Sequence, residues 1–415
     1  MLFFGAHIIA NYWLQIPEAE MTLVALSPAI FFVAIASVMR GYFNGRQNIK
    51  ATARSQTIEQ VFKTALTIIL VEIVAIISNV STEWMAGGAT LATTLATMSG
   101  FGYLYLYYKT RRKEIATEIK STVNYKYERV RSIIKKILLV SIPIALTAIM
   151  SSLNKNIDSF TVVRSLKQFM PEDMAIAQYG ILGGKVDTLT SLPLSINVAF
   201  STALVPAISA AKARKDKKTI TEKTSFSLLT SMLIGLPCTI GMCIFAGPIL
   251  NLLFPNASDG TVILQISSLT ILFTILDQTI NGALQGYGKL KIPTISLGVG
   301  VIVKLILNLI LVPIPEIGIN GAAWASVACH AVAFTIAITA LIKNIKLNLT
   351  FSKFVIKPAI ATAIMGICSY FIYSNLLGII SSKLATIVAI VLAVVIYVLT
   401  IIAVSYTHLR AHETR

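Results

Sequence analysis

Apolar runs separated by short polar segments recur along the whole chain. Eleven of them reach the roughly 20 residues that an α-helix needs to cross a bilayer core of about 30 Å. These predicted spans lie at 21–43, 57–79, 85–108, 137–157, 183–208, 226–250, 262–285, 294–313, 321–342, 356–377 and 384–404. A shorter run, 1–13, is interpreted as the end of a span that begins ahead of this sequence. The pattern predicts an all-α polytopic membrane protein with eleven full spans and one partial span.

The composition agrees with this fold class. Of the 415 residues, 55% are apolar and 13% are charged, whereas about 25% of the residues in a soluble protein are charged. A soluble enzyme, a disordered chain and a disulfide scaffold are therefore excluded. All four cysteines lie inside apolar stretches, and no metal-ligand, phosphate-loop or hydrolase motif is present. We expect no metal, no cofactor, no catalytic residue and no enzymatic activity.

Basic residues are concentrated in alternate loops. The loops 44–54, 109–136, 209–224, 286–292 and 343–357 carry 25 Lys and Arg residues, whereas the other loops carry four. The positive-inside rule therefore predicts that the basic loops and the C-terminus are cytoplasmic. This distribution accounts for most of the net charge of +17, so no nucleic acid partner is needed.

Two polar segments receive separate interpretations. The basic segment 109–136 is predicted to be a cytoplasmic linker that contains an interfacial helix near anionic lipid. The last residues, 405–415, follow an apolar run abruptly and resemble translated cloning sequence, so we treat them as a non-native tail. His408 and His412 are excluded from any metal site for the same reason.

An internal repeat relates two parts of the chain. Residues 40–71 match 281–312 without a gap, and the offset of 241 pairs Gly41 with Gly282 and Lys63 with Lys304. Chance similarity between apolar helices is the alternative. A parallel repeat predicts two pseudo-symmetric helical bundles and about 110 further residues ahead of this sequence. We divide the chain into the remainder of an N-terminal bundle (1–108), the linker (109–136), a C-terminal bundle (137–342) and two additional helices (356–404).

Four segments carry a family resemblance: RGYFNGRQN (40–48), SQTIEQVFK (55–63), the stretch from YGILGGKVD to LVPAIS (179–209) and NGALQGYGKLKIP (281–293). Together they resemble the multidrug/oligosaccharidyl-lipid/polysaccharide exporter superfamily. The similar branch holds the polysaccharide transporters with stage V sporulation protein B and the peptidoglycan lipid II flippases. The resemblance implies a fourteen-helix protein of the bacterial cytoplasmic (inner) membrane. It also implies alternating-access flipping of an undecaprenyl-pyrophosphate-linked sugar, with the lipid tail beside the last two helices.

Such a task requires positive charge for the pyrophosphate in a wet cavity, and ionisable residues inside spans are functional candidates by default. Lys185 is our first candidate for a phosphate contact, with a snorkelling lysine as the alternative; Asp187 would orient it or couple an ion. Asp158 and Arg164 follow the span 137–157 and could form a gating salt bridge at the outer mouth, or lie in a solvated loop.

Three further residues belong to the repeat region. Glu59 and Lys63 are four residues apart and could pair along one helix face, either toward the cavity or as a structural pair. Arg40 is a gate, an anchor or a substrate ligand. Asp277 is expected to find a partner across the bundle, and His330 is expected to be a packing residue.

Three functions remain open at this stage. The first is a flippase for a lipid-linked oligosaccharide, most of all the peptidoglycan precursor lipid II, with membrane lipids around it and Na⁺ or H⁺ as a possible coupling cation. The second is transport of another lipid-linked polysaccharide by the same fold, or exchange of a drug for cations by that fold. The third is an integral membrane glycosyltransferase or acyltransferase, which would need a catalytic residue on a longer outer loop.

Overall fold

The computed structural model describes residues 2–13, 19–46, 48–77, 82–121, 128–255, 257–347 and 350–413. Every regular element in these residues is a helix. The chain divides into two compact units, Met1–Tyr127 and Glu128–Arg415, and each is described by itself. The sequence-based bundles themselves remain a prediction.

Unit 1 is built on three long helices. Its elements are α1 (Leu2–Ile8), the π-helical turn η1 (Ile9–Trp13), α2 (Ala19–Gly45), α3 (Ile49–Ile77) and α4 (Thr82–Ser121). Helix α4 packs along both α2 and α3, whereas α2 and α3 touch each other only slightly. Ala36, Phe43, Ala51 and Leu104 form the buried core of this unit.

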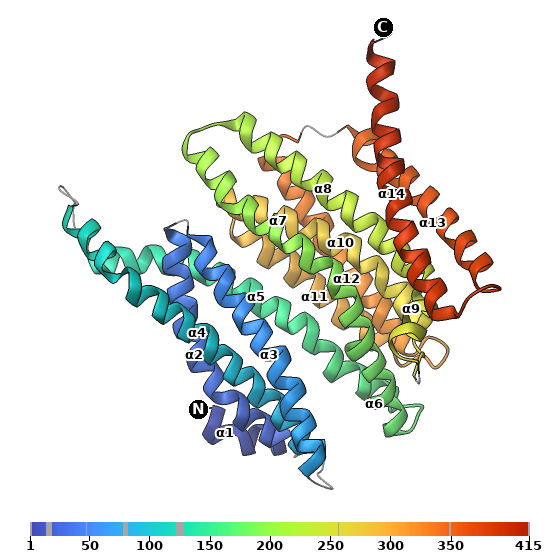
Figure 1. Cartoon of the computed structure of the whole chain (residues 1–415), viewed down its shortest axis with the longest axis horizontal. Coiled ribbons are helices and arrows are strands. Elements are labelled where there is room, and N and C mark those ends of the chain that lie inside the picture. Colours follow the sequence, from blue (N-terminus) through green and yellow to red (C-terminus); the bar gives the residue numbers. More distant parts are fainter. Residues whose placement is uncertain are drawn as a thin grey trace. The chain divides into compact units, whose positions relative to one another are not determined.

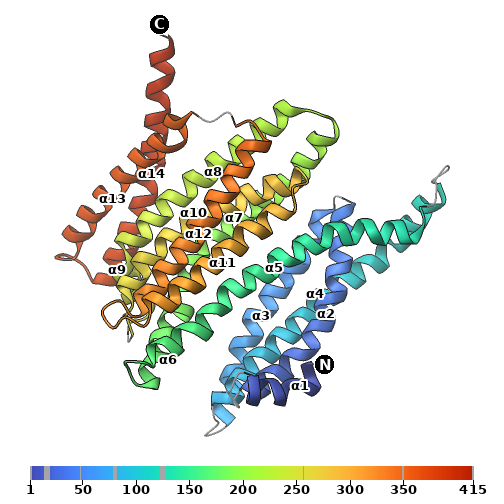
Figure 2. The same ribbon diagram turned by 180° about the vertical axis from the view of Figure 1, so that it is seen from behind.

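Unit 2 holds the remaining helices. They are α5 (Val130–Leu166), α6 (Glu172–Gly180), η2 (Ile181–Val186), α7 (Asp187–Ala213), α8 (Lys217–Ile244), α9 (Ala246–Leu253), α10 (Thr261–Gly286), α11 (Lys291–Leu311), α12 (Ile319–Asn344), η3 (Ser352–Ile356), α13 (Lys357–Leu376) and α14 (Ser382–Glu413). Helix α10 is central because it packs on α7, α8 and α12. Figures 1 and 2 show α7 and α8 as an antiparallel hairpin and α13 beside α14.

Small residues set the closest helix crossings in unit 2. A Cβ on Gly282 of α10 would lie 2.6 Å from the carbonyl oxygen of Ser201 of α7. A Cβ on Gly300 of α11 would lie 2.6 Å from the carbonyl oxygen of Cys329 of α12. Because these backbones are nearly in contact, only glycine fits, as is usual where membrane helices pack closely.

The helices related by the offset of 241 pack in the same order. In unit 1, α4 contacts α2 and α3; in unit 2, α12 contacts α10 and α11. Several equivalent positions are buried in both: Ser55 and Ser296, Ala92 and Ala333, Ala96 and Ala337, Leu104 and Ile345. This agreement supports the repeat, while pseudo-symmetry of the two bundles stays a prediction.

Nine helical segments of the described chain are long and apolar enough to cross a membrane. They coincide with nine of the eleven predicted spans. Of the other two, 57–79 lies in α3 up to Ile77, beyond which its last two residues are outside the described ones, and 85–108 lies in α4. Helix α3 carries Glu59, Lys63 and Glu72 along that stretch, which lowers its apolar character. The protein is a multi-pass membrane protein, and the count of eleven stays a prediction.

Two boundary predictions are wrong. Helix α5 continues to Leu166, so the segment after 157 is helical and not a loop. The predicted span 226–250 is interrupted at Phe245, between α8 and α9. In the described residues of the segment 109–136, α4 continues to Ser121 and α5 starts at Val130, and the linker with its interfacial helix stays a prediction. An ion pair between Arg46 and Glu118 fastens the α4 extension to the end of α2.

Candidate functional site

A buried ion pair lies between α5 and α11 of unit 2. The ammonium Nζ of Lys304 is 2.6 Å from Oδ2 of Asp158, and the two side chains are only 4% and 9% exposed. Lys304 also donates to the carbonyl oxygen of Asn154, at 2.9 Å. The second carboxylate oxygen of Asp158 accepts from Asn308, at 2.9 Å. Both charges are therefore neutralised and hydrogen-bonded, as burial of an ion pair requires.

Local sequence explains why this pair forms. Asn154 and Asp158 are one helical turn apart on α5, and Lys304 and Asn308 are one turn apart on α11. Closer to the start of α5, the carbonyl oxygen of Pro143 accepts from two hydroxyl groups. One belongs to Thr147 of α5 and the other to Thr294 of α11. The two helices are thus held together at two levels.

Further charged groups surround the pair. Asp187 at the start of α7 interacts electrostatically with Asp158, Lys304 and Lys155. The side chains of Asp187 and Lys155 are exposed, whereas Asp158 and Lys304 are buried. The group contains two acidic and two basic residues, so its formal charge is balanced. Its exposed members need water or a polar ligand if they lie within the membrane.

The predicted salt bridge between Asp158 and Arg164 does not form. Asp158 binds Lys304 instead, and Arg164 is exposed near the end of α5. The reason is geometric, since residues six apart on a helix point to different faces. Both residues belong to α5 and not to the outer loop that the sequence predicted.

Within the part of the chain that the structure describes, Lys185 has no charged partner. Its Nζ donates to the carbonyl oxygen of Ala257 at 2.5 Å and lies 5.5 Å from the ring centre of Phe254. The residue belongs to the π-helical turn η2, which follows Tyr179 and Gly180. Asp187 interacts with the Asp158–Lys304 pair. Within the described chain, no hydrogen bond or ion pair joins Asp187 to Lys185, whose Nζ is engaged by Ala257.

A second charged cluster joins the three helices of unit 1. Arg40 of α2 donates to Glu59 at 2.5 Å and to Ser55 at 3.1 Å, both on α3. Ser55 in turn donates to the carbonyl oxygen of Gly100 on α4, at 3.2 Å. A Cβ on Gly100 would lie 3.2 Å from a carboxylate oxygen of Glu59. The absence of a side chain at Gly100 therefore lets α4 approach this ion pair.

The structure also contradicts the predicted pairing of Glu59 with Lys63. Glu59 binds Arg40 from a different helix, which reaches it with a planar, multidentate guanidinium. Lys63 is exposed on α3 and has no ion pair within the described chain. Its repeat counterpart Lys304 is buried and paired. The two lysines thus share a sequence position but differ in environment.

Polar residues next to these motifs were not singled out from the sequence. In unit 1, Thr52 donates to Asn44 at 2.7 Å, and Asn48 donates to the hydroxyl of Tyr107 at 3.0 Å. In unit 2, Lys304 was indicated only as a repeat match, and Asn308 was not indicated at all. The signal that could have found both is the spacing of four between polar residues inside one apolar span.

Two other in-span residues have polar partners, one on the same helix and one on another. Asp277 accepts from Asn281 at 2.8 Å on the same helix, so the predicted partner across the bundle is wrong. His330 lies 3.5 Å from the amide nitrogen of Asn154, at the edge of the Asp158–Lys304 cluster. Among the described residues, no group of three His, Cys, Asp or Glu side chains converges in a way that could hold a metal ion.

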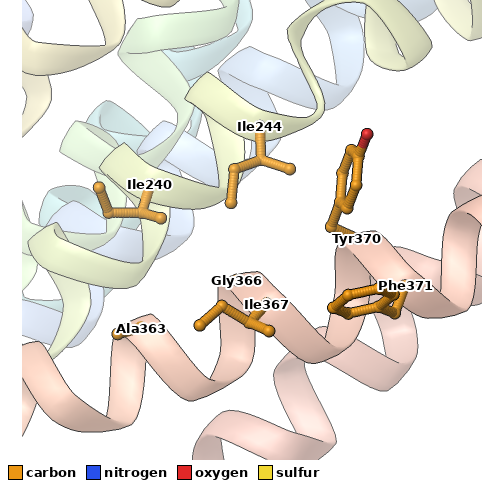
Figure 3. A pocket seen from close by; sticks show the side chains of 7 residues that line it. All are labelled: Ile240, Ile244, Ala363, Gly366, Ile367, Tyr370 and Phe371. Carbon is orange, nitrogen blue, oxygen red and sulfur yellow. The ribbon is translucent and has the colours of Figure 1, made fainter.

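An apolar pocket of about 370 Å³ lies between α8 and α13. Figure 3 shows Ile240 and Ile244 on one side, and residues from Ala363 to Phe371 on the other. A Cβ on Gly366 would lie 2.9 Å from Cδ1 of Ile244, so this glycine sets the approach of the two helices. The hydroxyl of Tyr370 is the one polar side-chain group among the lining residues.

The sequence matches a known family over most of its length. The family described as "Lipid II flippase MurJ" matches residues 23–389. Stage V sporulation protein B of Bacillus subtilis is 26% identical over 378 residues, which are 89% of this chain and 72% of that protein. Lipid II flippase MurJ of the same organism is 24% identical over 315 residues, 74% of this chain and 57% of that protein. The chain thus spans between about half and three quarters of these relatives.

Solved structures share the fold. A structure titled "Lipid II flippase MurJ, inward closed conformation" has a TM-score of 0.67 and 16% identity, and the match covers 98% of this chain and 81% of that one. An outward-facing multidrug resistance MATE family transporter of the MOP superfamily has a TM-score of 0.62 and 16% identity over 82% of this chain and 75% of that one. Family and fold point to transport and not to a chemical reaction, which disfavours the glycosyltransferase or acyltransferase alternative.

Proposed function

The chain belongs to the lipid II flippase MurJ family, and from this premise we propose that it moves a lipid-linked saccharide across the bacterial cytoplasmic membrane. The substrate class is an undecaprenyl-pyrophosphate-linked sugar, and lipid II is the leading member. Transport proceeds by alternating access, without breaking a bond. The basic loops and the C-terminus face the cytoplasm.

One observation supports this proposal most directly. Charged side chains are exposed on helices that are long and apolar enough to span a membrane. Lys155, Arg164 and Asp187 lie on such helices of unit 2. Charge within a span is costly unless it meets water, an opposite charge or a polar ligand. A wet route for an anionic head group meets that requirement.

Two basic residues suit the pyrophosphate. Lys63 is exposed near the middle of α3, and Arg164 is exposed near the end of α5; neither has an ion pair among the described residues. A free ammonium or guanidinium is available for a phosphate oxygen. Lys185 and Arg40 are weaker candidates because a carbonyl oxygen and a carboxylate already engage them.

The pocket between α8 and α13 suits part of the lipid tail. Apart from the hydroxyl of Tyr370, its side chains are apolar, and two of them, Ile367 and Phe371, are exposed on α13. An isoprenoid chain gains free energy there by the same burial of apolar surface that packs the helices. The head group would travel in water while the tail remains in hydrocarbon.

A coupling cation, Na⁺ or H⁺, is part of the proposal. Moving one elementary charge against 100 mV costs about 2.3 kcal/mol. The membrane potential therefore changes the free energy of moving an anionic substrate, with a sign that depends on the direction of movement. Asp187 is the exposed acidic candidate, while Asp158 is already neutralised by Lys304. Glu59 is likewise neutralised by Arg40.

A second candidate function is transport of another lipid-linked polysaccharide. The match to stage V sporulation protein B covers more of this chain than the match to MurJ of the same organism. The MATE-like fold also keeps a cation-coupled drug antiporter open. A drug antiporter should bind a cationic ligand, however, and the exposed candidates Lys63 and Arg164 favour an anion.

Complementation tests the function. A bacterium depleted of its lipid II flippase is supplied with this protein, and lipid II is labelled from outside the cell. We expect growth and labelled precursor. Lys63→Ala should reduce both, whereas Lys63→Arg, which keeps the positive charge, should retain most of them. Precursor that stays on the cytoplasmic side despite normal protein levels would contradict lipid II as the substrate.

A further inference from the structure

A buried acidic side chain in the central helix of unit 2 has no basic partner among the residues that the structure describes. Asp277 lies in α10, which is long and apolar enough to span the membrane, and it is 8% exposed. Its Oδ2 accepts from the amide of Asn281 at 2.8 Å. Its Oδ1 is buried and has no hydrogen-bond partner, and the same holds for Oδ1 of Asn281.

Among the described residues, no element packed on α10 forms an ion pair with Asp277. Lys185 of η2 donates to the carbonyl oxygen of Ala257. His330 of α12 lies beside Asn154 of α5. On α7 the charged residues are Asp187 and Lys212, near its two ends, and on α8 all charged residues lie in the first two turns. The α9 helix has none. On α11 the nearby cation, Lys304, is bound to Asp158 of α5. On α12 the group that interacts electrostatically with Asp277 is the thiol of Cys329.

Depth makes an unpaired carboxylate costly. Asp277 is nine residues from the end of α10 at Gly286 and sixteen from its start at Thr261, or roughly 13 and 24 Å along a helix. A carboxylate buried at such a depth needs a proton, a metal cation or a basic side chain. The described residues supply no basic side chain, so a bound cation is required.

The number of free oxygens distinguishes a proton from a metal ion. Hard metal cations are held by several oxygens at once. Among the described residues, two buried side-chain oxygens of α10 have no hydrogen-bond partner, Oδ1 of Asp277 and Oδ1 of Asn281. A proton needs one carboxylate oxygen, and the unpartnered Oδ1 of Asp277 provides it. The geometry therefore favours a proton.

We propose that Asp277 is a proton-binding site inside unit 2, which gains a proton on its free carboxylate oxygen and releases it during the transport cycle. Uptake changes the charge of the side chain from −1 to 0, and the Asn281 amide keeps the carboxyl oriented in both forms. The binding of the proton rests on the structure of α10, whereas its coupling to transport rests on the proposed function.

Infrared difference spectroscopy of the purified protein tests the site directly. We expect a carbonyl stretching band of a protonated carboxyl that disappears in Asp277→Asn and shifts in Asp277→Glu. The control Asp259→Asn removes an exposed acid of the loop before α10 and should leave the band unchanged. A spectrum of a folded Asp277→Asn protein that is identical to that of the wild type would overturn the site.

Transport in proteoliposomes tests the coupling. Vesicles carry a lipid-linked saccharide, and its movement is measured with and without a proton gradient. The wild type should be faster with the gradient, and Asp277→Asn should move substrate at one rate in both conditions. Gradient dependence that survives in Asp277→Asn would overturn the coupling. If neither protein moves any saccharide, the proposed function fails, while the infrared result still decides the proton site.

Discussion

At the scale of single residues, five in-span charges of the described chain fall into two groups. Arg40, Glu59, Asp158 and Lys304 are each held by an opposite charge from another helix. Lys63 is exposed and has no ion pair within the described chain. The first group joins helices, and its removal should affect folding. The exposed residue can be changed with less effect on folding, which makes the two roles separable by measurement.

Removal of one partner of the buried pair should destabilise unit 2. Lys304→Met leaves Asp158 buried without a cation, and such a loss costs about 3–5 kcal/mol. Thermal unfolding of the purified protein should therefore occur at a clearly lower temperature than for the wild type. The matched control is Lys63→Met at the equivalent repeat position, which is exposed; its melting temperature should stay close to that of the wild type.

The double variant Lys304→Met/Asp158→Leu removes both charges of the buried ion pair. Replacing a whole buried ion pair by apolar residues is often neutral or stabilising. The double variant should therefore recover most of the stability that Lys304→Met loses. Equal stability of Lys304→Met and the wild type would instead mean that Asp158 finds another partner or stays protonated.

At the scale of helices, glycine positions control the crossing of α7 and α10. Gly282→Ala places a methyl group 2.6 Å from the carbonyl oxygen of Ser201, so the helices must separate. Overpacking of this kind costs about 1–3 kcal/mol. The control is Gly241→Ala in α8, where a Cβ meets nothing within 4 Å and the helix propensity rises. Gly282→Ala should melt earlier than the wild type, and Gly241→Ala should not.

The start of α8 should depend on pH through Asp216. This N-cap carboxylate accepts from the hydroxyl of Thr219 at 2.6 Å and from its backbone N–H at 3.0 Å. These hydrogen bonds lower the pKa of Asp216 in the folded protein. The contribution of this carboxylate to the stability of the first turn of α8 is therefore present above its unfolded-state pKa. It is lost as the pH falls through the pKa of the folded protein. Hydrogen exchange at residues 217–220 should measure this.

Asp216→Asn keeps a capping oxygen but removes the titration. Exchange in this variant should be protected to the same degree at acidic and neutral pH, relative to the intrinsic rate at each pH. Asp216→Ala should be less protected at both. A wild type whose protection matches that of Asp216→Asn at every pH would mean that the carboxylate does not stabilise the turn.

The sequence predicts the membrane-spanning helices more readily than the ion-pair partners of the charged side chains within them. Apolar runs predict spans because each helix must satisfy its own backbone in lipid, and nine predicted spans coincide with apolar helices. The pairing of Glu59 could not be derived the same way. Spacing pointed to Lys63 on the same helix, but helix packing brought Arg40 to Glu59. Likewise, a polar stretch after residue 157 suggested a loop, because Asp158 and Arg164 are charged; burial of Asp158 against Lys304 keeps it helical.

At the scale of the whole molecule, the repeat explains why the two units share a packing order. Their in-span charges nevertheless differ. Ser55 and Ser296 are equivalent and both buried, so the core register is kept. Lys63 and Lys304 are equivalent too, yet only Lys304 has an acidic partner. A common scaffold with different in-span charges allows one unit to bind an anion while the other holds a fixed ion pair.

Orientation in the membrane can be tested on the intact protein. The loops with 25 basic residues should be cytoplasmic, since translocation of Lys and Arg is disfavoured. In a variant without the native cysteines, Asp259→Cys should react with an impermeant maleimide added to whole cells. Lys217→Cys should react only after the membrane is opened. Both positions are exposed, so access and not burial decides the result. Labelling of Lys217→Cys in sealed cells would invert the topology, and the proposed direction of transport would have to be reversed with it.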